Sequence, residues 1–81
     1  MRIEVQMFAA ARELAGRETI HVEVGDSANV ADVIDAIGQQ IPGLAALLPS
    51  CRLAVDNSYV TCEATVCANN EIALIPPVSG G

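Results

Sequence analysis

The sequence has no lysine and no tryptophan, and it contains one phenylalanine and one tyrosine among its 81 residues. Four basic residues stand against ten acidic ones, which gives a net charge of −6. Because such a surface repels a phosphate backbone and no basic stripe is present, we expect no binding to nucleic acid. Hydrophobic residues make up 52% of the chain, so a core can form from Val, Ile, Leu and Ala. That composition suits a sheet covered by a helix.

Long apolar runs are also missing. No segment approaches the ~20 apolar residues of a membrane-spanning helix. The first residues alternate between polar and apolar side chains, unlike the apolar stretch of a secretion signal. We therefore expect a cytoplasmic protein without a membrane partner.

Cysteine is scarce, and its number is odd: Cys51, Cys62 and Cys67 cannot all pair within the chain. Cys62 and Cys67 have the first spacing of a plant-type iron–sulfur site, but Asn70 stands where that site needs a third cysteine. Zinc-binding pairs of cysteine or histidine are absent as well. We expect no bound metal and no bound cofactor.

Alternating polarity predicts a strand over residues 2–7 and a second strand over residues 19–24. Between them, residues 9–15 have the composition of a short helix. Gly16 can end that helix, because glycine readily adopts the left-handed conformation found just past helix C-termini. The first third of the chain is therefore expected to form strand, short helix and strand.

A longer helix is expected to begin after Asn29. Asparagine is a good N-cap, and Asp32 lies in the first turn, where the positive helix end favours an acid. Pro42-Gly43 should end the helix, and residues 44–48 could form a further short turn of helix. Apolar residues recur at helical spacing along one stripe: Val30, Val33, Ile34, Ile37 and Ile41.

Several short strands follow. Residues 53–55 should form one strand, Asp56-Asn57 a tight turn, and residues 58–61 the returning arm. Asn69-Asn70 predicts another turn, because asparagine tolerates positive φ better than most residues. Residues 71–75 should form the last strand, and their apolar run is typical of a central strand.

This order of elements predicts an α+β fold of the β-grasp, ubiquitin-like type. In that arrangement one main helix crosses one face of a mixed sheet. The first and last strands lie side by side in the middle of the sheet. Residues 1–75 should form the domain, and residues 76–81 a flexible C-terminal tail.

The tail has unusual chemistry. Pro76 and Pro77 lack backbone donors, so the sheet must end there and the chain must leave it extended. Gly80 and Gly81 have no Cβ, which leaves the terminal carbonyl open to attack in a narrow channel. A carboxylate is inert as an acyl donor until it is activated, normally by adenylation with ATP. The pattern indicates a carrier whose terminal carboxylate is activated by another protein.

Three stretches together resemble the small subunit of molybdopterin synthase, a family of ubiquitin-like sulfur carriers. The resemblance extends over nearly the whole chain, and the terminal Pro-Pro-Val-Ser-Gly-Gly is its most specific part. The stretches are Phe8-Ala9 with Arg12-Glu13 and Gly16, residues 53–57, and residues 75–81.

The resemblance implies that Gly81 is adenylated by an activating enzyme that uses ATP, with transient AMP and then sulfur on the terminal glycine. The thiocarboxylate would donate sulfur to a cyclic pterin precursor (precursor Z), which builds the dithiolene of molybdopterin. The large synthase subunit would supply the catalytic residues, so this chain has no active site of its own, and the complex would be a heterotetramer. The tail that enters the large subunit comprises Pro76, Pro77, Val78, Ser79, Gly80 and Gly81.

The resemblance also implies a docking surface made by Phe8, Tyr59 and Ile75 around the base of the tail. An exposed apolar patch of this kind needs a partner to cover it. The residues alone leave another interpretation open, in which Phe8 and Tyr59 fill the small core.

Three other functions stay open from the sequence. A carrier of the same type could serve thiamine synthesis or tRNA thiolation. A ubiquitin-like modifier would instead join Gly81 to lysines of target proteins. An electron-transfer β-grasp protein is the third alternative, and it would need a coloured centre.

Overall fold

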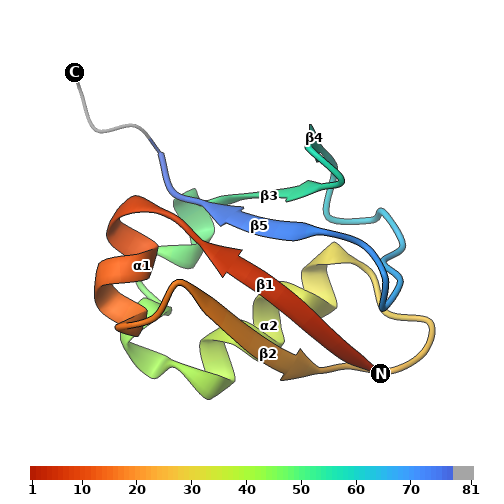
Figure 1. Ribbon diagram of the computed structural model, residues 1–81, viewed down its shortest axis with the longest axis horizontal. Coiled ribbons are helices and arrows are strands. Elements are labelled where there is room, and N and C mark those ends of the chain that lie inside the picture. Colours follow the sequence, from red (N-terminus) through yellow and green to blue (C-terminus); the bar gives the residue numbers. More distant parts are fainter. Residues whose placement is uncertain (78–81) are drawn as a thin grey trace.

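Strand pairing builds one mixed five-stranded sheet in the order β2-β1-β5-β3-β4 (Figure 1). The computed structural model describes residues 1–77. β1 and β5 pair in parallel at the centre, and every other pairing is antiparallel. This is the predicted β-grasp arrangement, with the first and last strands adjacent. The strands are β1 (Arg2–Met7), β2 (Thr19–Glu23), β3 (Arg52–Val55), β4 (Ser58–Tyr59) and β5 (Ile72–Ile75).

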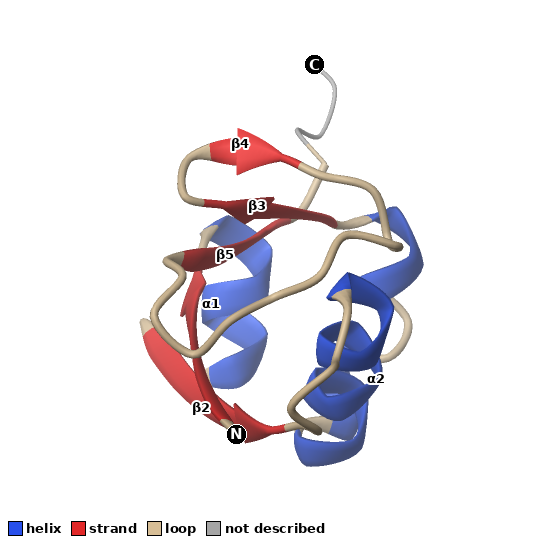
Figure 2. Ribbon diagram, turned by 90° about the vertical axis from the view of Figure 1, so that its right-hand side faces the viewer, coloured by secondary structure: helices blue, strands red, loops and turns tan. Residues whose placement is uncertain are grey.

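The main helix α2 (Val30–Gln40) lies across one face of the sheet (Figure 2). Asn29 is its N-cap, as predicted, and Asn29 and Asp32 together form a capping box that was not predicted. The Asn29 side chain accepts a hydrogen bond from the backbone N–H of Asp32 at 3.0 Å, and the Asp32 carboxylate accepts one from the backbone N–H of Asn29 at 3.0 Å. Two backbone donors at the helix start are thereby satisfied by side chains.

The short helix α1 (Ala9–Ala15) lies at the end of the sheet where β1 stops and β2 starts (Figure 1). Gly16 ends it with φ of 71°, and its backbone N–H donates to the carbonyl of Arg12 at 2.9 Å. The predicted role of Gly16 as a left-handed stop is confirmed.

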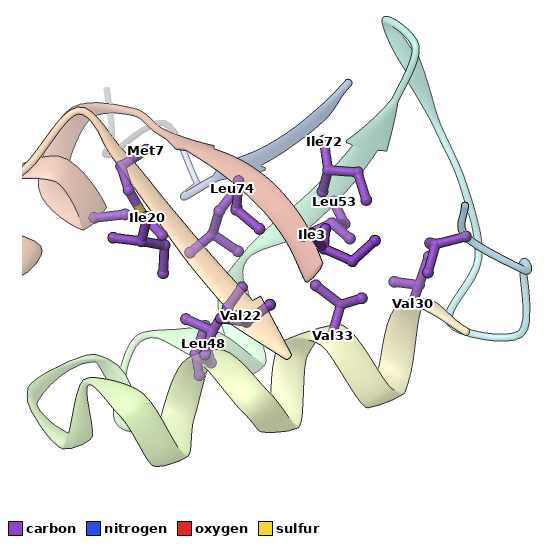
Figure 3. Packing of buried hydrophobic residues seen from close by; sticks show 14 of the residues in the cluster. Ile3, Met7, Ile20, Val22, Val30, Val33, Leu48, Leu53, Ile72 and Leu74 are labelled. Carbon is purple, nitrogen blue, oxygen red and sulfur yellow. The ribbon is translucent and has the colours of Figure 1, made fainter. Parts of the chain in front are cut away.

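The core is aliphatic and lies between the sheet and α2. Burial alternates along β1, where Ile3, Val5 and Met7 are buried and the residues between them are exposed. Figure 3 shows Val30 and Val33 of α2 beneath residues of the sheet. The largest fully buried side chains are Ile3, Ile20, Ile37, Leu44, Leu53, Ile72, Leu74, Val5, Val22, Val30, Val33 and Val66.

The region after α2 differs from the prediction of one short helix over residues 44–48. Two 3-10 helices, η1 (Pro42–Leu44) and η2 (Leu48–Ser50), flank a turn instead. Each has a proline in its first turn, where the missing N–H is not needed and the fixed φ suits the helical conformation.

The predicted turn at Asn69-Asn70 forms for a different reason than expected. Positive φ does not occur there; it occurs at Asp56 (51°) and Asn57 (69°). The second turn is closed by hydrogen bonds instead: the backbone N–H of Asn70 donates to the carbonyl of Cys67 at 3.0 Å. The returning arm is also shorter than residues 58–61, because pairing with β3 covers only Ser58 and Tyr59.

Replacing Ile37 by alanine should lower the free energy of unfolding by about 2–5 kcal/mol, because the side chain is fully buried and its removal leaves a cavity. Urea titration of purified protein measures the loss. Leu14→Ala is the matched control, since Leu14 is 53% exposed and should lose less than about 1 kcal/mol. Equal losses in the two variants would contradict the core described above.

Candidate functional site

The base of the tail lies at the centre of the sheet. β5 pairs with β1 on one side and β3 on the other, and its last rung joins Ile75 to Arg52. Pro76 follows immediately and cannot donate to the ladder, so the strand ends there. Pro76 is buried and Pro77 is exposed. The other predicted tail residues lie outside the described residues: Val78, Ser79, Gly80 and Gly81.

A shallow hollow adjoins this base. It measures about 240 Å³, and Phe8, Tyr59 and Ile75 all line it, together with Ala73. Ala73 and Ile75 alternate along β5 with buried residues, so they lie on the face of the sheet that α2 does not cover. The structure thus brings the three predicted docking residues together, and their role in docking stays a prediction.

The two aromatic side chains do not fill the core. Phe8 is 45% exposed and Tyr59 is 58% exposed, so the interpretation that they complete the small core is wrong. Both rings line one hollow beside β5, together with the polar side chains of Gln6, Asn57 and Glu71.

Phe8 is placed by the switch from β1 to α1. It is the N-cap of α1 with extended backbone angles, φ −125° and ψ 150°, and its carbonyl accepts hydrogen bonds from Ala11 and Arg12. Met7 before it is buried, so the strand alternation turns Phe8 outward. Ala9 after it has φ of 49°, a left-handed conformation that costs an L-residue roughly 1–2 kcal/mol.

Tyr59 is placed by the β3–β4 hairpin. The turn residues Asp56 and Asn57 both have positive φ, which is the pattern of a two-residue turn matched to strand twist. Tyr59 stands opposite Ala54, and the guanidinium carbon of Arg52 lies 5.4 Å from the centre of its ring. This is a cation–π contact. Arg52 was not among the site residues predicted from the sequence, although its diagonal position to Tyr59 across a two-residue hairpin could have indicated it.

Ion pairs lie near both ends of β1, outside the lining of the hollow. Arg12 lies 3.8 Å from Glu18, and both side chains are largely exposed. Exposed pairs of this kind contribute little stability. At the far end of β1, the Met1 ammonium donates a hydrogen bond to the carbonyl of Val24 and lies 3.6 Å from Asp26.

The three cysteines differ in environment. Cys51 is half-buried and its Sγ donates to the carbonyl of Leu47 at 3.3 Å, whereas Cys62 and Cys67 are exposed. Burial raises the pKa of the Cys51 thiol. Within residues 1–77, no cluster of three or more His, Cys, Asp or Glu side chains is arranged to hold a metal ion. No helix in the same range is long and apolar enough to cross a bilayer.

Comparisons with known proteins agree with one another. The sequence model of the ThiS family matches residues 5–81. The chain is 35% identical to the molybdopterin synthase sulfur carrier subunit of Chlamydomonas reinhardtii, with all of both chains covered. It is 31% identical to small archaeal modifier protein 1 of Haloferax volcanii, covering 98% of this chain and all of that one. The crystal structure of SAMP1 from Haloferax volcanii superposes with a TM-score of 0.88 at 29% identity over the full length of both chains.

Cys51 should be the slowest of the three cysteines to react with iodoacetamide. The thiolate is the reactive form, and a raised pKa leaves less of it at a given pH, so its labelling should need higher pH. Mass spectrometry of peptides after timed labelling measures the three rates. In urea the three rates should converge, which is the control. Labelling of folded Cys51 as fast as that of Cys62 would contradict the prediction.

Proposed function

Because this chain belongs to the ThiS family, we propose that it is a sulfur carrier of molybdenum cofactor biosynthesis, the small subunit of a molybdopterin synthase. The observation that supports this most directly is full-length similarity to a named sulfur carrier subunit, combined with a C-terminus that ends in Pro-Pro-Val-Ser-Gly-Gly. The β-grasp fold of residues 1–77 agrees with it.

The proposed chemistry takes place at the carboxylate of Gly81. An activating enzyme transfers AMP from ATP to this carboxylate and releases pyrophosphate. A sulfur nucleophile then displaces AMP and leaves a thiocarboxylate, and the sulfur passes to a cyclic pterin precursor. Two such transfers build the dithiolene. Glycine at positions 80 and 81 presents no side chain that could obstruct these attacks.

The proposed partner of the hollow is the large synthase subunit, which would also supply the catalytic residues. Phe8, Tyr59 and Ile75 surround the point where β5 ends, so a protein seated on them holds the start of the tail at a fixed place. Aromatic side chains in a partly enclosed apolar surface are typical anchors of protein interfaces. The net charge of −6 would favour encounter with a basic partner.

A second candidate function is protein modification, which the similarity to a small archaeal modifier protein favours. In that case the activated glycine forms an isopeptide bond with a lysine of a target. A carrier that serves thiamine synthesis or tRNA thiolation would share the activation step and differ in the acceptor. Conjugates that survive a denaturing gel would distinguish modification from sulfur transfer.

Incubation with the activating enzyme, ATP and a sulfur source should raise the intact mass by the difference between sulfur and oxygen. Deleting Gly81 should abolish that shift, because the carboxylate then stands one residue too short for the activating enzyme. Leu14→Ala, a change on exposed surface of α1, serves as the control and should become charged normally. A thiocarboxylate on the truncated chain would refute the assignment.

Replacing Tyr59 or Phe8 by alanine should weaken binding to the purified large subunit by about 10–30-fold, because each ring would lose contact area at the centre of the interface. Isothermal titration calorimetry measures the affinity. Leu14→Ala again provides the control, with an expected change below about twofold. Unchanged affinity in both aromatic variants would place the interface elsewhere.

A further inference from the structure

The turn that leads into β4 is tied by hydrogen bonds to the residues just before β5. The Asp56 carboxylate accepts one hydrogen bond from the backbone N–H of Glu71 at 2.8 Å and another from the side-chain amide of Asn70 at 2.8 Å. The backbone N–H of Asp56 donates to the carbonyl of Glu71 at 2.8 Å. Asn70 in turn accepts from the backbone N–H of Cys67 at 2.6 Å. We call Asp56 and Asn70 the turn clamp.

The pairing of β3 with β4 is short. β4 contains two residues, and the next hydrogen bond along the pair, from Val60 to the carbonyl of Leu53, is long at 3.4 Å. A hairpin of this length is marginal without tertiary contacts. Hydrogen bonds to a carboxylate are stronger than those between neutral groups, so the turn clamp is a main restraint on the hairpin.

The hairpin carries Tyr59, and the clamp connects it to the strand that leads into the tail. The same hollow is lined by Asn57, Tyr59, Glu71 and Ile75. Asp56 accepts a hydrogen bond from the backbone of Glu71, so it restrains one wall of that hollow. The turn clamp therefore joins the turn that precedes Tyr59 to the residues that precede β5.

We propose that Asp56 and Asn70 are positioning residues, which hold the hairpin with Tyr59 beside β5 in the arrangement that the partner recognises. This proposal rests on the proposed docking of a large subunit at the hollow. The clamp acts through Tyr59 and does not itself need to touch the partner or the reacting carboxylate.

The chemistry of the clamp allows its two members to be exchanged. In Asp56→Asn combined with Asn70→Asp, the amide at position 56 donates to the carboxylate at position 70. Side-chain oxygens also remain available to the backbone N–H groups of Glu71 and Cys67. The single changes do not have this property. In Asp56→Asn, the amide nitrogens of residues 56 and 70 face each other, or one of the two side chains loses its hydrogen bond to the backbone. In Asn70→Asp, two carboxylates face each other.

The experiment compares the wild type, both single variants and the exchanged double variant. Affinity for the purified large subunit should fall about 5–10-fold in each single variant and return to within about twofold in the double variant, as expected for directly coupled residues. Tyrosine fluorescence should change in each single variant and return to the wild-type value in the double variant. It reports on Tyr59 alone, because Tyr59 is the only tyrosine and the chain has no tryptophan. Asn69→Asp is the matched control, since it adds the same charge at an exposed neighbouring position and should change neither readout.

The proposal is overturned if the single variants lower the melting temperature but leave affinity and Tyr59 emission unchanged, because the clamp is then structural only. It is also overturned if Asn69→Asp weakens binding as much as Asn70→Asp, or if the double variant does not recover. A wild-type chain that fails to bind the large subunit contradicts the proposed function instead, and the emission series then still decides whether the clamp positions Tyr59.

Discussion

The parallel pairing of β1 with β5 is the constraint on which the rest of the structure depends. Its register places Met7 opposite Leu74. Since parallel strands run in the same direction, Phe8 after Met7 and Ile75 after Leu74 lie at the same end of the two central strands. Two segments that are far apart in the sequence are brought together at the base of the tail in this way. An antiparallel pairing would have placed Phe8 at the opposite edge from the C-terminus.

The same pairing explains how a chain with two aromatic residues can expose both of them. The buried residues on β1, β5 and α2 include no aromatic side chain. Phe8 follows Met7, the last buried residue of β1, and lies outside the strand. Tyr59 lies on β4, the two-residue edge strand next to β3. The core is complete without either ring, so both rings are available for contact with another molecule.

Local patterns in the sequence predicted the elements that depend on local physics. The alternation of β1, the N-cap at Asn29 and the left-handed stop at Gly16 were all predicted, because each involves residues within a few positions. The β-grasp topology followed from element order, and the ThiS match confirms the family resemblance. The contacts that were missed join distant residues: Asp56 reaches Asn70 across a gap that no periodicity indicates. The two 3-10 helices at Pro42 and Pro49 were missed because residues 44–48 have good helical propensity by themselves.

One feature of the charge distribution bears on reactivity. Each cationic side chain, including Arg52 over the Tyr59 ring and Arg12 beside Glu18, is a guanidinium. A lysine in either place would supply similar charge, but its free amine could capture an acyl group from a neighbouring copy with an activated terminus. A guanidinium keeps its proton at physiological pH and is a poor nucleophile. If the terminus is activated as proposed, copies of this chain offer no lysine amine to one another, so one copy cannot be joined to another through a lysine isopeptide bond.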